Sequence, residues 1–380
     1  MSRSNACGHD VEHVYVHVPF CPTICPFCDF HVLERRAGAV AAYLDRLERD
    51  AAEAARFLGH RGVSTVYLGG GTPSYLREAE LERLVGILVR HLGWATEEAT
   101  LEVHPLTVTP SRARAWVALG FTRLSLGVQS TQDEVLRFLG RPHDAAGGLA
   151  ALDAVLAAGA ATTSVDVITA VPGQDVHLDL ERLVSSGVDH LSAYTLTIEP
   201  GTPFARDGVE VDAAAEAAAL QAAADVLGRH GFERYEVSNH ARPGQRCAHN
   251  LAYWHNRCYL GLGPGASCFE PAPEGALADV VGCRRTSPPL ERWLAGERGS
   301  DEPVTRHDLL REAVLTRLRL REGVDLADVS ARAGLDARAE LAGPLDAVVA
   351  AGLAELVEGR WLRPTPAGFA LLDQVTATFL

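Results

Sequence analysis

The first two thirds of the chain alternate short β-type runs with longer amphipathic stretches, and this alternation limits the folds open to it. Six apolar, β-branched runs predict strands over residues 13–18, 64–68, 100–103, 123–128, 164–168 and 190–196. Helical patterns such as 41–58 and 81–92 lie between them. Such alternation builds parallel βαβ units, and no dinucleotide-type glycine fingerprint follows the first strand. We therefore expect an α/β fold, a partial (β/α)6 TIM-like barrel with its chemistry where the strands end.

The later part of the chain changes character. We take residues 1–240 as the barrel, the Gly- and Pro-rich residues 241–302 as a connecting region, and residues 303–380 as a C-terminal domain. In the last segment helical patterns precede a strand pair around 352–368, which predicts a mostly helical, winged-helix-like domain. Acidic residues are frequent there, so a packing or lid domain is favoured over DNA binding.

Charge and hydropathy exclude several classes of function. The formal net charge is −14, and all 35 cationic side chains are Arg. We therefore expect no nucleic-acid partner and no chemistry that requires a lysine, such as Schiff-base formation or a Walker-type phosphate site. No apolar run approaches the roughly 20 residues of a membrane span, and the N-terminus lacks a signal-peptide pattern. The expectation is a cytoplasmic protein without a membrane span.

Three of the eight cysteines form a compact group. Cys21, Cys25 and Cys28 have C-x3-C-x2-C spacing on a loop after the first strand. Three thiolates can bind three irons of a cubane cluster and leave its fourth iron without a protein ligand. Zinc is the alternative, but it would want a fourth ligand and usually paired C-x2-C elements. We predict a 4Fe–4S cluster here, and mostly structural roles for the scattered Cys7, Cys247, Cys258, Cys268 and Cys283.

Polar and glycine residues recur at the ends of successive strands. The loop 69–73 (GGGTP) follows the second strand, Glu102 and Gln129 end the third and fourth, and Asp166 lies in the fifth. Arg141 follows the fourth strand in LGRPH. Any one of these polar side chains is more often a satisfied hydrogen-bond partner than a ligand. Because the carboxyl ends of barrel strands meet at one face, their succession predicts a shared site.

The cysteine spacing, together with YVHVPFC, GGGTPSYL, GFTRLSLGVQS and HLSAYTLTIEPGTPF, resembles one family over nearly the whole length. This is the radical S-adenosylmethionine (SAM) family of the oxygen-independent coproporphyrinogen III oxidase and its relatives. The resemblance implies an enzyme in which Cys21, Cys25 and Cys28 form the catalytic centre. SAM would bind the open iron and be cleaved to a 5′-deoxyadenosyl radical, with electrons from a flavodoxin- or ferredoxin-type donor.

The resemblance also implies a set of SAM contacts, because the family's oxidase binds two SAM molecules. Carried over position by position, the contacts of the first SAM are Tyr15, Gly70 and Glu102. Those of the second SAM are Phe27, Gly71, Thr72, Gln129, Arg141 and Asp166.

Members of this family differ at identifiable positions. The oxidase has a further cysteine two residues after the third ligand, where this chain has Phe30, and a longer N-terminal arm, so we do not expect porphyrinogen oxidation. The haem chaperones of the family share the Cys-Asp-Phe ending and an H-N-x-x-Y-W motif, here residues 249–254. A His can bind haem iron while aromatic rings cover the macrocycle. His249, Tyr253 and Trp254 are therefore candidates for contact with haem or substrate, and a packed loop is an equal alternative.

The chain departs from the chaperones at strand ends and glycine loops. It has His104-Pro105 where they typically have Asn-Pro, residues 170–173 (AVPG) for a Gly-Leu-Pro-Gly type loop, and 266–268 (ASC) for Ala-His-Gly. A third group, the class C methyltransferases and cyclopropanases, is similar throughout and uses two SAM molecules. We expect methyl or methylene transfer to a small planar substrate, by C-methylation or cyclopropanation. The alternative is a haem chaperone that binds haem and transfers it to acceptor proteins.

Overall fold

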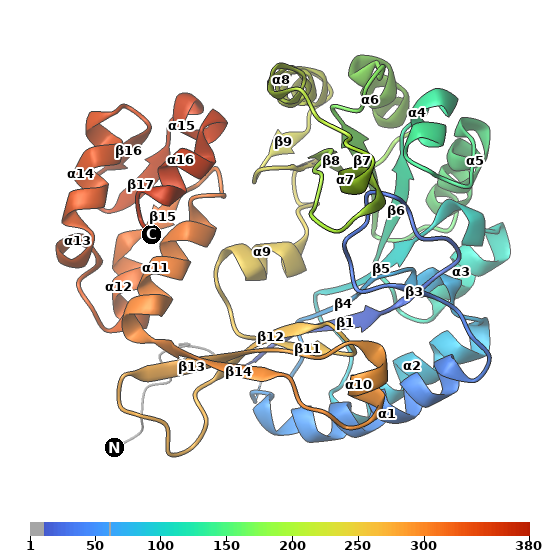
Figure 1. The fold of residues 1–380 in the computed structure, drawn as a ribbon, viewed down its shortest axis with the longest axis horizontal. Coiled ribbons are helices and arrows are strands. Elements are labelled where there is room, and N and C mark those ends of the chain that lie inside the picture. Colours follow the sequence, from blue (N-terminus) through green and yellow to red (C-terminus); the bar gives the residue numbers. More distant parts are fainter. Residues whose placement is uncertain (1–10, 61) are drawn as a thin grey trace.

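The computed structural model describes residues 11–60 and 62–380, so Cys7 lies outside the described residues. Six strands predicted from the sequence form the centre of one sheet and run parallel to one another (Figure 1). In sheet order they are β1 (His13–Val18), β4 (Thr65–Gly70), β5 (Glu98–Val103), β6 (Arg123–Gln129), β7 (Thr162–Thr169) and β8 (His190–Thr195). The α/β partial barrel is therefore confirmed.

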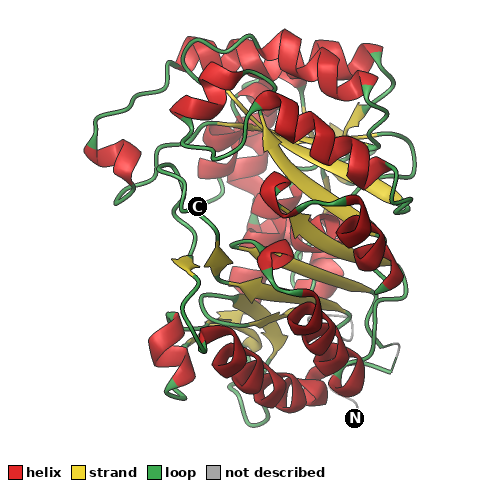
Figure 2. Cartoon of the chain, turned by 90° about the vertical axis from the view of Figure 1, so that its right-hand side faces the viewer, coloured by secondary structure: helices red, strands yellow, loops and turns green. Residues whose placement is uncertain are grey.

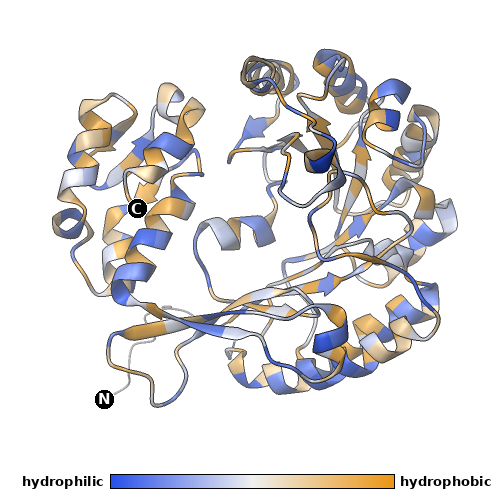
Figure 3. Ribbon diagram, in the orientation of Figure 1, coloured by the Kyte–Doolittle hydropathy of each residue, from blue (hydrophilic) through white to orange (hydrophobic). Residues whose placement is uncertain are grey.

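Helices connect these strands and cover the outside of the sheet (Figure 2). They are α1 (Ala39–Ala54), η1 (Ala55–Phe57), α2 (Glu78–His91), α3 (Pro110–Ala118), α4 (Asp133–Phe138), α5 (Ala145–Leu156), α6 (Val176–Ser185), α7 (Pro203–Arg206) and α8 (Ala213–Arg229). In α1 the buried residues Val40, Tyr43, Leu44 and Leu47 recur every three or four positions, so one stripe faces the sheet. Figure 3 shows the resulting mixture of hydrophobic and hydrophilic residues along the outer helices.

Residues 241–302 extend the barrel sheet at one edge. β11 (Tyr259–Leu262) pairs parallel with β1, and β12 (Ser267–Pro271), β13 (Val280–Thr286) and β14 (Ser300–Thr305) follow as antiparallel strands. The opposite edge carries β10 (Asn239–Ala241) and β9 (Glu233–Arg234). One continuous hydrophobic core runs from Val11 to Leu309 and includes Phe269 and Trp293. The segment that the sequence analysis set apart as a connecting region thus shares the core of the barrel.

The remaining short elements lie near the strand ends or at the sheet edge. They are β2 (Phe20–Cys21), β3 (Leu33–Glu34), η2 (Pro73–Tyr75), η3 (Pro105–Thr107), α9 (Ala248–Trp254) and α10 (Leu290–Leu294). In Figure 1, α9 lies between the barrel and the C-terminal helices. Its last turn is held from the C-terminal side, because Arg332 Nη1 donates a hydrogen bond to the His255 carbonyl at 2.8 Å and Arg317 Nη2 donates to the same oxygen at 3.4 Å.

The C-terminal part has a hydrophobic core of its own, from Leu310 to Phe379. Its helices are α11 (Arg306–Arg317), α12 (Leu326–Ala333), α13 (Ala337–Glu340), α14 (Ala342–Ala350), α15 (Pro366–Ala370) and α16 (Leu372–Ala377). The expected strand pair is β16 (Ala354–Val357) with β17 (Trp361–Pro364), and β15 (Val324–Asp325) completes a three-stranded sheet. None of the described helices of the protein is long and apolar enough to cross a membrane.

Candidate active site

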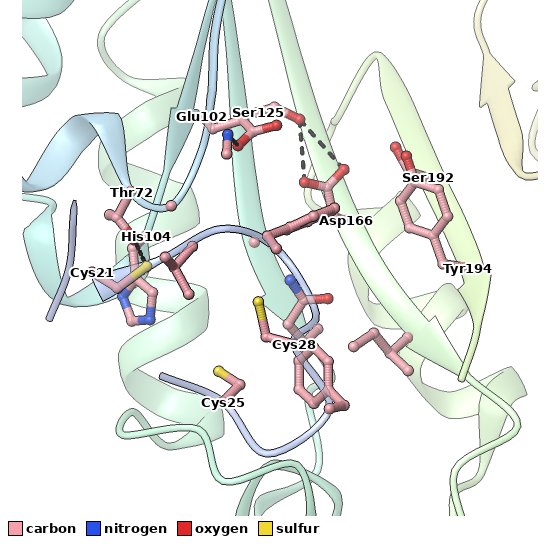
Figure 4. Close-up of a pocket in the computed structure, with 18 of the residues that line it drawn as sticks. Cys21, Cys25, Cys28, Thr72, Glu102, His104, Ser125, Asp166, Ser192 and Tyr194 are labelled. Atoms are coloured by element: carbon pink, nitrogen blue, oxygen red, sulfur yellow. Dashed lines mark hydrogen bonds between the residues drawn. The ribbon is translucent and has the colours of Figure 1, made fainter. Parts of the chain in front are cut away.

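The three clustered cysteines lie in the segment between β1 and α1, Cys21 at the end of β2 and the other two on the loop that follows, and they line a cavity of about 430 Å3. The cavity opens where the barrel strands end, and Figure 4 shows the three thiols on its wall, opposite Asp166 and Tyr194. This volume lies within the range of small-molecule sites. The cysteine loop therefore forms one side of a ligand-sized chamber.

The cysteine loop fits a cubane cluster better than a single metal ion. Among the described residues, no three His, Cys, Asp or Glu side chains converge closely enough to hold one metal ion. In a cubane each cysteine binds a different iron, so such convergence is not required. Thr72 Oγ1 donates a hydrogen bond to Cys21 Sγ at 3.4 Å, and Arg141 Nη1 donates to Cys25 Sγ at 3.3 Å. Donors of this kind suit thiolates that bind a metal.

Burial favours the protonated thiols of two of the three cysteines, Cys21 and Cys28. It raises the pKa of Cys21 to about 11 and also raises the pKa of Cys28. Metal binding to these residues is therefore coupled to proton release. The chemistry that the cluster would supply is electron transfer to SAM bound at its open iron.

The glycine loop after β4 has no room for side chains. A Cβ at Gly70, whose φ is +99°, would lie 2.3 Å from the His17 ring, and a Cβ at Gly71 would lie 2.7 Å from the Val18 carbonyl oxygen. His17 Nε2 in turn lies 2.9 Å from the His31 carbonyl, which follows the cysteine loop. Tyr15 OH bonds His17 Nδ1 at 3.1 Å. His17 thus joins the two loops that a ligand would contact, and bare backbone is left facing the cavity.

Two carboxylates lie on the cavity wall opposite the cysteines. Glu102 accepts hydrogen bonds from Tyr67 OH at 2.9 Å and from the Gly70 amide at 3.0 Å. Burial, together with the nearby Asp166, raises the pKa of Glu102 to about 7. Burial also raises the pKa of Asp166 to about 6, although the Ser125 hydroxyl lies 3.4 Å from both its oxygens. A cation bound in the cavity would lower the pKa of both acids, because it favours their ionised forms.

The end of β6 is shaped by an irregular backbone. The pairing of β6 with β7 shifts register between Leu126 and Gln129, and Gln129 has a φ of +69°. A Cβ at Gly127 would lie 2.9 Å from Gln129 Nε2, so the Gln129 side chain folds back over that glycine. Arg141 Nη2 donates to the Gly127 carbonyl at 3.0 Å. Strained backbone of this kind is common at ligand sites.

The structure brings most of the predicted site residues to this one cavity. Its lining includes Cys21, Cys25, Phe27, Cys28, Gly70, Gly71, Thr72, Glu102, Gln129, Arg141 and Asp166. Four other candidates are not part of the lining: Tyr15, His249, Tyr253 and Trp254. Tyr15 packs behind the cavity wall, where its ring is 6.1 Å from that of Tyr67.

His249 is fully buried, with 0% exposure, and both its ring nitrogens are bonded. Nδ1 bonds Thr65 Oγ1 at 2.7 Å and Nε2 bonds Tyr253 OH at 2.9 Å. Burial lowers the pKa of His249 to about 3. The ring therefore offers no free nitrogen to an iron in this arrangement, and the residues of α9 that do line the cavity are its N-cap Cys247 and Asn250.

Several cavity residues were not anticipated from the sequence. Ser125, Ser192 and Tyr194 line the cavity without having been singled out, whereas His104, which also lines it, stands at a strand end that the sequence analysis named among the departures from the chaperones. Tyr194 is 42% exposed although it lies within a barrel strand, because its ring faces the cavity (Figure 4). Alternation along β8 would have placed Ser192 and Tyr194 on the face of Asp166, since β7 and β8 pair Asp166 with Ser192.

Comparisons with known proteins agree with this architecture. The family model of the radical SAM superfamily matches residues 15–184, and that of the HemN C-terminal domain matches residues 304–371. The fold resembles coproporphyrinogen III oxidase (HemN) from Escherichia coli, with a TM-score of 0.81 and 24% identity, covering 98% of this chain and 92% of that one.

Curated relatives extend the similarity to sequence. The heme chaperone HemW of Mycobacterium tuberculosis is 35% identical, over 97% of this chain and 94% of the relative. HemW of Escherichia coli is 32% identical over 85% and 86%, and the mitochondrial radical SAM domain-containing protein 1 of Danio rerio is 30% identical over 83% and 75%. Methyl or methylene transfer finds no support among these names. The chain belongs to the radical SAM family of which the HemW proteins are members.

Proposed function

We propose that this protein is a haem-binding member of its family, which carries a 4Fe–4S cluster on Cys21, Cys25 and Cys28, binds SAM beside it and passes haem to acceptor proteins. The observation that carries the proposal is similarity over nearly the full length of relatives named heme chaperone, at 97% and 94% coverage. The cavity supports the cluster and SAM parts of the proposal, because cysteines, bare glycine backbone and two buried acids line one chamber.

The roles of the cavity residues follow from their chemistry. Glu102 and Asp166 are placed to neutralise the ammonium or sulfonium group of SAM, and Arg141 to bind a carboxylate. Gly70 and Gly71 line the chamber without side chains, so a ligand would meet backbone there. Electrons would come from a flavodoxin- or ferredoxin-type donor. The exposed Phe30, at 64%, lies next to the cluster loop and is a natural contact for such a partner.

In this proposal His249 supports the barrel wall. A direct bond from its ring to haem iron would require the hydrogen bond at the coordinating nitrogen to break, that of Nδ1 with Thr65 or that of Nε2 with Tyr253. Tyr253 and Trp254 would then pack α9 in place, and haem would bind without them.

Methyl or methylene transfer is the second candidate, and one observation favours it. The six residues that the resemblance assigns to a second SAM line the same cavity as Gly70 and Glu102, two of the three assigned to the first. They are Phe27, Gly71, Thr72, Gln129, Arg141 and Asp166. A site that holds two SAM molecules would suit transfer of a carbon from one of them. The substrate would be small and planar.

One experiment separates the two candidates. The protein is reconstituted anaerobically with iron and sulfide, reduced with dithionite in the presence of SAM, and assayed for 5′-deoxyadenosine and S-adenosylhomocysteine, with and without haem. Haem binding is followed by its Soret band, and transfer by adding apomyoglobin as the acceptor. We expect stoichiometric haem binding, transfer to apomyoglobin and little SAM turnover. Abundant formation of both SAM products without haem binding would contradict the chaperone proposal and support methyl or methylene transfer.

A further inference from the structure

His104 ends β5 and caps the short helix η3. Its Nδ1 accepts a hydrogen bond from the Leu106 amide at 3.2 Å. A ring nitrogen that accepts carries no proton, so the neutral imidazole has its proton on Nε2. His104 therefore presents an N–H donor on the side of the ring away from the cap.

The cap does not itself require histidine. An asparagine side chain can cap such a turn with its oxygen. What the imidazole adds is the second N–H, further from the backbone. His104 lines the cavity, and among the described residues no group accepts a hydrogen bond from its Nε2. Histidine at this position thus places an unused donor in the chamber.

The surroundings of His104 indicate what this donor faces. In Figure 4 His104 lies on the same side of the cavity as Cys21 and Thr72. Two side chains there already donate hydrogen bonds to cysteine sulfurs, Thr72 to Cys21 and Arg141 to Cys25. Behind the ring, His143 packs edge-on at 5.7 Å between centroids, and its Nε2 donates to the Val128 carbonyl at 3.1 Å. His143 is thus engaged with backbone, whereas His104 is free to serve the cavity.

We propose that His104 Nε2–H donates a hydrogen bond to the sulfur shell of the cluster held by Cys21, Cys25 and Cys28 and raises its reduction potential. The inference rests on the cluster of the proposed function. A hydrogen bond to cluster sulfur stabilises the more negatively charged, reduced state. His104 is then a positioning and tuning residue.

The test is a redox titration of the full-length, reconstituted protein without SAM, followed by the electron paramagnetic resonance signal of the reduced cluster. In His104→Asn, which keeps the cap, we expect a lower midpoint potential. At a fixed potential the ratio of reduced to oxidised cluster should fall by up to about tenfold, because only the difference in strength of this hydrogen bond between the two oxidation states contributes. His143→Asn is the matched control, because it removes the neighbouring ring without removing a cavity donor, and it should titrate like the parent.

An unchanged potential in His104→Asn would overturn the inference, and so would a shift that appears only after SAM is added, since the donor would then serve SAM. A second measurement needs no variant. Parent protein labelled with 15N-histidine should show weak nitrogen coupling to the reduced cluster, and absence of that coupling also overturns the inference. Failure of the parent to bind iron at all would instead contradict the cluster assignment, so the two failures are distinguishable.

Discussion

Two histidine-containing regions lie on the barrel, and they use their histidines differently. Around the cysteine loop, His104 bonds backbone through one nitrogen and leaves the other toward the cavity. Where α9 packs on the barrel, His249 forms hydrogen bonds with Thr65 and Tyr253 through its two nitrogens and has no exposed surface. The residue within a recognisable motif is thus the one committed to structure, and the residue outside any motif is available to a ligand. A sequence motif can identify a histidine, but only the hydrogen bonds of its ring show whether a nitrogen is available to a ligand.

The largest expected effect is at the cysteine loop. Cys25→Ala should lose nearly all reconstituted cluster iron, because a cubane held by two protein ligands lacks the third anchor. Iron content and visible absorbance after anaerobic reconstitution measure this. Cys283→Ala is the control, since Cys283 lies on β13 outside the cavity lining, and it should retain the parental iron content. Equal iron in both variants would place the cluster elsewhere.

The next largest effect concerns the contact between α9 and the barrel. His249→Ala should lower the free energy of unfolding by about 3 kcal/mol, because it leaves a cavity and unpaired hydroxyls on Thr65 and Tyr253. Urea denaturation measures this, and haem titration of the folded variant should match the parent. The exposed His177→Ala is the control for both assays. If the variant has parental stability but no longer binds haem, His249 is a haem ligand and not a structural residue.

A pH profile tests the cavity acids. Because the pKa of Glu102 is raised to about 7, a cationic ligand must displace a proton from it at lower pH. We expect the affinity of the reconstituted protein for SAM to fall about tenfold from pH 8 to pH 6, measured by equilibrium dialysis. Glu102→Gln should bind more weakly, and the part of the profile due to Glu102 should be lost. A parental slope in that variant would assign the titration to another group.

The same raised pKa predicts the stability of the ligand-free protein. A buried acid whose folded pKa exceeds its unfolded value stabilises the fold below about pH 4.5, and that stabilisation is lost as the pH rises through about 7. Glu102→Gln should therefore gain stability relative to the parent as the pH rises through this range. Urea denaturation at pH 5 and pH 8 gives the difference, and a constant difference would contradict the raised pKa.

The smallest effect again concerns α9. Thr65 Oγ1 lies between His249 Nδ1 and His13 Nδ1, the latter at 2.9 Å. Thr65→Val should cost about 1–2 kcal/mol of unfolding free energy, since it preserves shape but removes both hydrogen bonds. Denaturation midpoints compared with the exposed Thr378→Val would detect this. If the two variants are equally stable, the His249 ring does not depend on Thr65.

Much of the fold was predictable because its signals are local. Apolar alternation located the six barrel strands, and the rule that parallel strands end at one face brought Glu102, Gln129 and Asp166 together. The strands β11 to β14 were not predicted, because glycine and proline interrupt their pattern. Tyr194 was missed because HLSAYTL was interpreted only as a strand, whereas the exposure of the Tyr194 ring depends on the cavity beside it.

The candidate site was predictable only in part. The expected methyl or methylene transfer came from small departures at strand ends, and the similarity to HemW proteins favours the alternative that the sequence analysis also held. His249 illustrates the physical reason. HNLAYW has the same letters whether α9 presents its histidine to a ligand or packs it on the barrel. Which of these happens is decided by Thr65, which lies 184 positions away in the sequence.

Arg317 and Arg332 both donate hydrogen bonds to the carbonyl at the end of α9, so the C-terminal domain and the barrel are not independent of one another. Cys247 and Asn250, at the start of α9, line the chamber, while the carbonyl of His255, just past its end, is held by guanidinium groups of the C-terminal domain. A chimaera that exchanges this domain between relatives would inherit a correctly shaped chamber only if both arginines travel with it. The C-terminal domain, which supplies no group to the chamber lining, is thereby part of what gives the chamber its shape.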